Sequence, residues 1–231
     1  MCKMPGVIKT NIKRAPKELI DEFKVLSTAI VSDAMNRMNS MSAEIKPIIG
    51  DVNIAGSAVT VQCIAGDNLM IHKAIYIAEP GDVIVIDARG HKDTAVWGNI
   101  MTKACKIRGI EAVVIDGSIR DIRENKEEKY PIFCKGVVPA GSQKSWGGNI
   151  NVPIQCGGAH VDPGDIIVGD DDGVVVVPRN IAKEVLKKAK ERAKTEEEWI
   201  NEIQKGKTTL EVIGLDKKLD ELGVEIKREE Q

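Results

Sequence analysis

The sequence predicts an α/β protein with a mixed sheet. Of its 231 residues, 42% are hydrophobic but only 3% are aromatic. The core must therefore consist mainly of Val, Ile, Ala and Leu, which suits buried strands flanked by helices. Apolar strands alternate with helices in the first half, an order typical of crossover units. Short strands follow one another without helices in the second half, which favours antiparallel or mixed pairing over a simple doubly wound sheet.

The N-terminal part of the chain contains two predicted helical regions separated by a strand. Between residues 17 and 39, apolar side chains recur every three or four positions, as in one bent helix or two short helices broken near Ser27. The β-rich run SAVTVQCI at 57–64 then predicts a strand. The segment 67–78 predicts a helix with Asp67 as its N-cap.

The middle of the chain predicts a crossover unit. PGDVIVID at 80–87 gives a turn followed by a short apolar strand. Residues 97–108 predict a helix, and EAVVID at 111–116 predicts the next buried strand. Because parallel strands end at the same edge of a sheet, we expect the loops of this unit to gather at one rim.

The second half predicts closely spaced strands. They lie at 132–138, 150–154, 155–161, 165–168 and 173–177. Two glycine pairs, Gly147-Gly148 and Gly157-Gly158, predict turns between strands. The sequence Pro-Gly-Asp followed by three apolar residues occurs at both 80–85 and 163–168, and each copy predicts a turn that leads into a strand.

From Arg179 onward the chain is predicted to be helical and highly charged. Ile181, Val185, Leu186 and Ala189 mark one apolar face. We therefore expect one domain over residues 1–178, including the N-terminal helices. Residues 179–231 are expected to form a helical extension that packs on this domain or on a neighbouring subunit.

Charge and cysteine usage restrict the class of protein. The net charge is -2 and the basic residues are scattered among acidic ones, which gives no support for nucleic-acid binding. We expect neither secretion nor membrane insertion, because the sequence shows no apolar run of the length that a signal peptide or a membrane span needs. The five cysteines are widely spaced and include no CxxC pair, so we expect reduced thiols in a cytoplasmic protein.

The sharpest chemical feature follows the strand predicted at 111–116. Arg120 and Asp121 stand at the mouth of this strand, where side chains are held rigidly but remain open to solvent. An arginine can bind a carboxylate through two hydrogen bonds, and an aspartate can hold a divalent cation or a water. The alternative is a salt bridge in a surface turn, which the spacing alone does not exclude.

The start of the helix at 97–108 is a second candidate feature. The substrate-binding candidates here are Gly98, Asn99, Ile100 and Met101. Backbone amides at a helix start lack partners, and the helix dipole favours an anion. If this rim meets Arg120, a carboxylate can lie between the amides and the guanidinium. The alternative is an ordinary helix N-terminus, with Gly98 present because Trp97 packs tightly.

The remaining polar features favour structural roles. His72 is a single histidine on a helix, which is poor evidence of catalysis, and with His91 and His160 it forms no metal triad. The Asp170-Asp171-Asp172 run lacks the later ligands of an EF-hand and predicts a tight turn. The sequence contains neither a Walker motif nor a strand-linked GxGxxG.

Several segments together resemble one protein family. They are WGNIMTKACKIRGIEAVVIDGSIRD with Arg123-Glu124 after it, DNLMIHKAI, PGDVIVID, NVPIQCGGAHVDPGDIIVGDDDGVVVVP and GLDKKLDELGVE. The family is that of the regulator of ribonuclease activity A and 4-hydroxy-4-methyl-2-oxoglutarate aldolase, the RraA-like family. The likeness covers roughly residues 27–224.

The resemblance implies a fold, an assembly and an activity. The fold would be a layered β/β/α swivelling-domain-like one with N-terminal helices and a C-terminal helical extension. Homotrimers or homohexamers would carry sites between subunits, and residues 1–178 would be the catalytic domain. Members that are enzymes resemble class II pyruvate aldolases, lyases that use Mg²⁺ or Mn²⁺ to cleave 4-hydroxy-2-oxo acids into pyruvate and a second carbonyl compound. Many also decarboxylate oxaloacetate.

The resemblance also implies roles for single residues. Arg120 would bind the 2-oxo acid and stabilise its enolate, Asp121 would ligate the metal, and amides from Gly98 to Met101 would hold the carboxylate. An acidic residue among positions 196–198 would reach a neighbouring site.

One position departs from the family pattern. Aldolase members typically carry an acidic residue where this chain has Asn99, whose amide can hold a water but cannot act as a base. We therefore expect oxaloacetate decarboxylation to be faster than aldol cleavage. The alternative within the family is a non-catalytic regulatory protein of the ribonuclease-inhibitor type. Regulators of that kind tend to lose the aspartate of the Arg-Asp pair, so Asp121 favours an enzyme.

Overall fold

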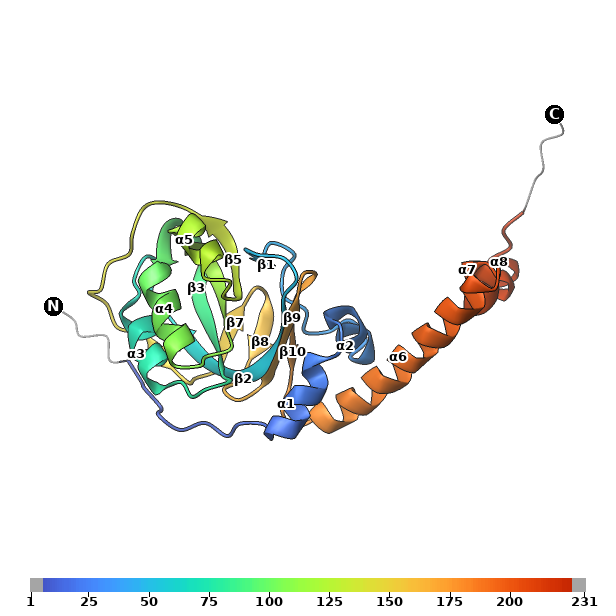
Figure 1. The fold of residues 1–231 in the computed structure, drawn as a ribbon, viewed down its shortest axis with the longest axis horizontal. Coiled ribbons are helices and arrows are strands. Elements are labelled where there is room, and N and C mark those ends of the chain that lie inside the picture. The colour runs from blue at the N-terminus through green and yellow to red at the C-terminus, as the bar shows by residue number, and fades with distance from the viewer. Residues whose placement is uncertain (1–5, 226–231) are drawn as a thin grey trace, which may run out of the picture. The chain divides into compact units, whose positions relative to one another are not determined.

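The computed structural model describes residues 6–225, and a mixed sheet forms its centre (Figure 1). The eight strands of this sheet run in the order β1 (Lys46–Pro47), β5 (Ile132–Val137), β4 (Ala112–Ile119), β3 (Val83–Trp97), β2 (Asn53–Gln62), β9 (Ile166–Asp170) and β10 (Gly173–Val177), with β6 (Asn149–Ile150) paired to β2. Strands β2, β3, β4 and β5 are mutually parallel, and the other pairings are antiparallel. The predicted mixed α/β class is confirmed.

The helices before residue 190 flank the sheet, and a separate hairpin covers part of it. The helices are α1 (Lys17–Lys24), α2 (Thr28–Ala34), α3 (Leu69–Ile77), α4 (Asn99–Ile107), α5 (Ile122–Glu127), α6 (Ala182–Gln204), α7 (Thr209–Ile213) and α8 (Asp216–Glu221). The hairpin consists of β7 (Ile154–Cys156) and β8 (Ala159–Val161). The N-terminal region therefore forms two helices, and Ser27 caps the second by accepting a hydrogen bond from the Ile30 amide.

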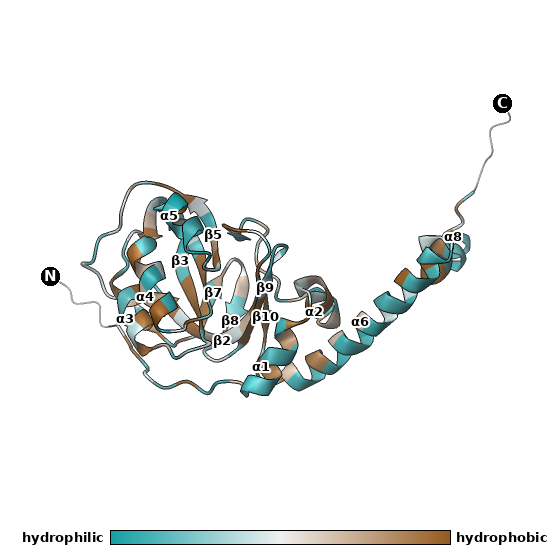
Figure 2. Cartoon of the chain, in the orientation of Figure 1, coloured by the Kyte–Doolittle hydropathy of each residue, from teal (hydrophilic) through white to brown (hydrophobic). Residues whose placement is uncertain are grey.

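The central strands bury both of their faces, which explains their continuous apolar sequences. On β3, Ile84 and Ile86 pack with helices α3 and α4, whereas Val83 and Val85 pack with the β7–β8 hairpin. The side chains of strand β4 also alternate between the helix side and the hairpin side. The result is a hairpin layer, a sheet layer and a helix layer, with the strands largely hydrophobic (Figure 2).

Several predicted boundaries are wrong in detail. The segment 150–154, predicted as one strand, contains only the end of β6 and the start of β7, and residues 151–153 between them are not a strand. Strand β3 continues to Trp97 through register shifts after Ile86, although its second half is too polar to have been predicted as a strand. The strand predicted at 155–161 is a hairpin, because Gly157 and Gly158 both adopt positive φ and turn the chain, so the turn predicted at this glycine pair is confirmed. The N-cap position of α3 is occupied by Asn68, one residue after the predicted Asp67.

The two Pro-Gly-Asp segments form the same turn. Gly81 and Gly164 both have φ 86, a conformation that favours glycine. In each turn the aspartate accepts a hydrogen bond from the amide three residues earlier, over 2.8 Å for Asp82 and 2.9 Å for Asp165. These turns start β3 and β9, as the sequence predicted.

The chain divides into two compact units, one up to Ala189 and one from Lys190. The first turns of α6 belong to the first unit and bury their apolar face. The second unit holds the rest of α6, α7 and α8, and a reciprocal capping box between Thr208 and Glu211 starts α7. Within residues 6–225, no helix combines the length and the apolar character needed to cross a bilayer.

Candidate functional site

The carboxyl ends of β3 and β4 bring the two predicted site segments together. Trp97 at the end of β3 lies opposite Ile119 at the end of β4. The Arg120 amide donates a hydrogen bond to the Trp97 carbonyl over 3.0 Å. Gly98 follows one strand and Arg120 the other, so the two rims meet.

Asp121 links the segment after β4 to the start of α4. Its Oδ2 accepts a hydrogen bond from the Asn99 amide at 3.0 Å and lies 3.8 Å from Arg120 Nε. Its backbone adopts a left-handed conformation with φ 58, which aspartate tolerates better than most residues. Oδ1 receives no hydrogen bond from the described residues and is free to bind a ligand. Asp121 therefore contacts the start of α4 as well as Arg120.

Two glycines make room for this pair. A Cβ on Gly98 would lie 2.7 Å from Asp121 Oδ2, and a Cβ on Gly141 would lie 2.6 Å from an Arg120 terminal nitrogen. Gly98 has an extended backbone that any residue can adopt, so a larger residue there is disfavoured by its close approach to the Asp121 carboxylate and not by conformation. The sequence offered two interpretations of Gly98, a backbone amide that binds a carboxylate and a small residue required by the packing of Trp97, and neither included the contact with Asp121.

We expect Gly98→Ala to lower turnover of a 2-oxo acid about tenfold, because the new methyl group displaces the Asp121 carboxylate. The unfolding temperature should stay close to that of the wild type. Gly50→Ala is a matched control, since the nearest atom to its Cβ would be 3.8 Å away. Equal activity of Gly98→Ala and the wild type would contradict this assignment of Gly98.

A buried chain of hydrogen bonds supports the Arg120 backbone. Trp97 Nε1 donates to Thr102 Oγ1 at 2.9 Å, and Thr102 Oγ1 donates to Asn125 Oδ1 at 2.6 Å. Asn125 Nδ2 then donates to the Arg120 carbonyl at 2.8 Å. Thr102 and Asn125 are fully buried. Side chains from β3, α4 and α5 thus fix the turn that presents Arg120 and Asp121.

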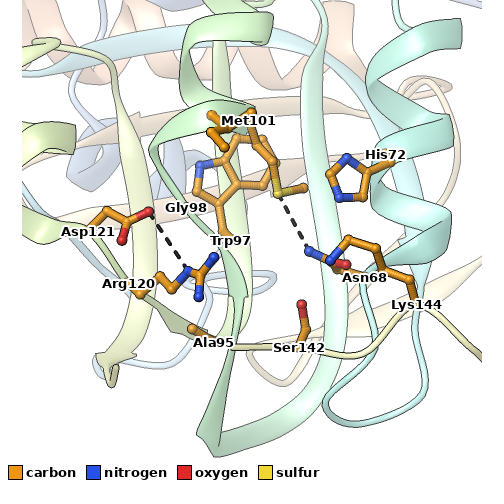
Figure 3. A pocket seen from close by; sticks show the side chains of 11 residues that line it. Asn68, His72, Ala95, Trp97, Gly98, Met101, Arg120, Asp121, Ser142 and Lys144 are labelled. Carbon is orange, nitrogen blue, oxygen red and sulfur yellow. Dashed lines mark hydrogen bonds and ion pairs between the residues drawn. The ribbon is translucent and has the colours of Figure 1, made fainter. Parts of the chain in front are cut away.

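A cavity of about 140 Å³ opens beside these residues (Figure 3). Its lining consists of Asn68, His72, Ala95, Trp97, Gly98, Ile100, Met101, Arg120, Asp121, Ser142 and Lys144. Arg120 and Asp121 form one side, and His72 and Lys144 face them from the other. The predicted residues Gly98, Ile100, Met101, Arg120 and Asp121 are therefore brought together.

The Asn99 side chain is not part of this lining. The side-chain Oδ1 of Asn99 is buried without a hydrogen-bond partner among the described residues. The backbone amide of Asn99 donates a hydrogen bond to Asp121. The Met101 amide donates to the Gly98 carbonyl at 3.0 Å. Four backbone amides were predicted to hold a carboxylate. Those of Gly98 and Ile100 have no hydrogen-bond partner within residues 6–225 and could receive it.

His72 lies at the cavity, whereas the sequence had favoured a structural role. Burial and, to a smaller extent, the nearby Lys144 charge lower the pKa of His72 below its usual 6.5. Its imidazole is therefore neutral at pH 7. The Asp170–Asp172 run forms a turn, as predicted, with Asp170 accepting hydrogen bonds from the amide and hydroxyl of Thr28.

The donor set at the cavity suits only a loosely held metal ion. No group of three His, Cys, Asp or Glu side chains within residues 6–225 is arranged to hold a metal. Mg²⁺, in contrast, keeps several waters and binds one or two carboxylates together with substrate oxygens. The open Oδ1 of Asp121 fits such an ion, which would be shared between the protein and its substrate.

Sequence reasoning missed most of the opposite wall. Ser142 and Lys144 line the cavity but stand in no recognisable motif, and Asn68 was not singled out within the segment DNLMIHKAI. The spacing of Asn68 and His72, four residues apart at the start of a helix, was the one available signal. Ser142 and Lys144 lie in an irregular segment after β5 that carries no periodic pattern.

Fold and cavity together define a mixed α/β protein with a small polar site where two parallel strands end. Residues 28–176 match the family described as "RraA-like: Aldolase/RraA". Over 186 residues the chain is 45% identical to a protein of Halalkalibacterium halodurans named "Putative 4-hydroxy-4-methyl-2-oxoglutarate aldolase", with 80% of this chain and 89% of that protein covered. The chain belongs to the RraA-like family.

Solved structures are similar to the chain over most of its length. An uncharacterized protein from Pseudomonas syringae pv. tomato superposes with a TM-score of 0.75 at 30% identity, covering 87% of this chain and 99% of that one. RraAS2 from Streptomyces coelicolor, described as an unusual member of the RNase ES inhibitor RraA family, gives 0.75 at 29% identity, covering 81% and 98%. The family thus includes proteins described as aldolases and as ribonuclease inhibitors.

Proposed function

We propose that the chain is a divalent-metal-dependent lyase that acts on 2-oxo acids through the enolate of pyruvate. The observation that carries this proposal is the Arg120 guanidinium beside the open Oδ1 of Asp121, at a cavity lined by helix-start amides. The similarity to a protein named as an aldolase supports it. The reaction would be aldol cleavage of a 4-hydroxy-2-oxo acid, decarboxylation of oxaloacetate, or both.

Both reactions develop negative charge at the same place. In aldol cleavage a base removes the C4 hydroxyl proton, the C3–C4 bond breaks, and its electron pair forms the enolate of pyruvate. In decarboxylation the same bond breaks with loss of CO₂. The Arg120 guanidinium can stabilise the developing charge, and the free amides of Gly98 and Ile100 can orient the carboxylate.

Asp121 would hold Mg²⁺ or Mn²⁺ through Oδ1. Such an ion, when bound, supplies positive charge at the oxygens of the 2-oxo acid. The backbone amide of Asn99 donates a hydrogen bond to Asp121 and so positions the Asp121 carboxylate. The side chain of Asn99 is not available as a base. We therefore propose that decarboxylation is faster than aldol cleavage.

Removal of divalent metal tests the proposal. We expect EDTA to lower oxaloacetate decarboxylation at least tenfold and Mn²⁺ or Mg²⁺ to restore it, since the metal would stabilise the enolate charge. Oxaloacetate and 4-hydroxy-4-methyl-2-oxoglutarate should be compared in one purified sample, after subtraction of the metal-catalysed background. Full activity in EDTA would show that the reaction does not need a divalent metal. Aldol cleavage faster than decarboxylation would contradict the role given to Asn99.

A non-catalytic regulatory protein is the second candidate, because RraAS2 comes from a ribonuclease-inhibitor family. A thermal shift with pyruvate or oxalate plus Mn²⁺ separates the two, since a ligand that binds the native state raises its apparent stability. No shift at millimolar ligand would favour the regulator. In either case we propose a homotrimer or homohexamer, which sedimentation of the full chain would test.

A further inference from the structure

A second cavity, of about 280 Å³, lies beside the candidate site and takes no part in the proposed reaction. We name it the Trp146 cavity, and its lining includes Gly66, His91, Thr94, Gly141, Gln143 and Trp146. One wall separates it from the site. Thr94 lines the Trp146 cavity, and the next residue, Ala95, lines the site. In the segment that pairs with Ala95, Gln143 and Lys144 divide between the two cavities in the same way.

Trp146 presents an exposed indole from a fixed backbone. Its side chain is 53% exposed and makes no hydrogen bond or ring contact with the described residues, whereas cationic side chains cover the rings of Tyr76 and Trp199. The Trp146 amide donates a hydrogen bond at 3.0 Å to the carboxylate of Asp67, which is 2% exposed. A single exposed apolar side chain is common, but this one borders a cavity and is held there by a buried carboxylate.

The lining of the Trp146 cavity is uncharged and has few free polar groups. It contains no Lys, Arg, Asp or Glu side chain, so an ionic ligand would lose its hydration there without gaining a charged partner. His91 Nε2 and Thr94 Oγ1 already bond to each other at 3.2 Å. The side-chain amide of Gln143 has no hydrogen-bond partner among the described residues, so it offers donors and an acceptor side by side.

These features favour a flat ring with apolar faces and a polar edge. A sugar carries hydroxyl groups around its whole ring and would need more partners than this lining supplies. An aromatic heterocycle needs partners only at its edge, and its face can stack on an indole. The volume lies near the lower limit of about 300 Å³ for small-molecule sites, which suits a single ring system.

We propose that the Trp146 cavity binds an uncharged heteroaromatic ring of purine size, such as the adenine ring of a nucleoside. The ring would stack on Trp146, and the Gln143 amide would pair with the amino group and ring nitrogen at the adenine edge. The Gln143 backbone is held by the Gly66 carbonyl and the Asn68 amide, so both partners are fixed in place. The proposal is independent of the lyase reaction, because it uses neither Arg120 nor Asp121.

Calorimetric titration of the full chain with adenosine tests this proposal. We expect Trp146→Ala to bind adenosine at least tenfold more weakly than the wild type, because it removes the stacking surface. Trp146→Phe keeps a ring and should retain most of the affinity. The wild type should also bind inosine at least threefold more weakly, since inosine has an oxygen where adenosine has the amino group. Gln143→Leu should remove this discrimination.

Trp199→Ala is the matched control. Trp199 belongs to the second unit, contacts Arg192 and does not line the cavity, so this variant should bind adenosine like the wild type. Trp146→Ala should keep the unfolding temperature of the wild type, because the indole is half exposed. No binding by the wild type at millimolar adenosine, or equal affinity in Trp146→Ala, would overturn the proposal.

Three further results would assign the cavity to another partner and would also overturn the proposal. The first is binding of methyl glucoside in place of adenosine, which would indicate a sugar site. The second is binding of oligoadenylate that is tighter than that of adenosine and falls steeply with salt, which would indicate nucleic acid. The third is a lower sedimentation mass of Trp146→Ala with no adenosine binding by either protein, which would place Trp146 at a contact with a second copy of the chain.

Discussion

Replacing Arg120 with alanine is expected to lower kcat/KM for oxaloacetate at least a hundredfold. The guanidinium lies where negative charge develops, and removal of one such donor commonly costs about 3 to 4 kcal/mol of transition-state stabilisation. A factor of one hundred corresponds to about 2.7 kcal/mol. Because the Arg120 side chain is 49% exposed, its removal should change the free energy of unfolding little.

The experiment compares the purified variants with saturating Mn²⁺. Arg123→Ala is a matched control, since Arg123 is an exposed arginine three residues later on α5 and does not line the cavity. Arg120→Lys keeps the charge but loses the planar pair of donors, so we expect it to recover only part of the activity. Activity of Arg120→Ala within tenfold of the wild type would exclude Arg120 as the enolate-stabilising residue.

Much of the fold follows from local sequence. The strands of the sheet centre are buried on both faces, so their sequences are continuous apolar runs that few other structures explain. The Arg120-Asp121 position is predictable for a related reason. Both residues directly follow one such run, and the ends of neighbouring parallel strands must lie at one edge.

The opposite wall follows from long-range contacts that leave no local pattern. Lys144 reaches the cavity because the Asp67 carboxylate binds amides that lie 78 and 79 residues further along the chain. The second half of β3 is polar and half exposed, so it lacks the apolar run that marks its first half. Asn99 was assigned to the site by its position in the chain, but its side-chain oxygen is buried outside the cavity lining.

Asn125→Ala is expected to lower the free energy of unfolding by about 3 kcal/mol. It leaves the buried Thr102 hydroxyl without its acceptor and the part-buried Arg120 carbonyl without its donor, and an unpaired buried polar group costs about 1 to 3 kcal/mol. Urea unfolding measures the change. Glu124→Ala, on the exposed side of the same helix, is the matched control and should stay within about 0.5 kcal/mol of the wild type.

Asn125 should also influence the site, because its amide holds the carbonyl of Arg120. Binding of pyruvate measured well below the unfolding temperature should weaken at least threefold in Asn125→Ala, an effect that loss of stability alone does not produce. Thr102→Val breaks the same chain one step earlier, so the double variant should lose less stability than the sum of the single losses. Additive losses together with unchanged pyruvate affinity would reduce Asn125 to a packing residue. The turn that presents Arg120 and Asp121 would then depend on its backbone contacts with β3 and α4.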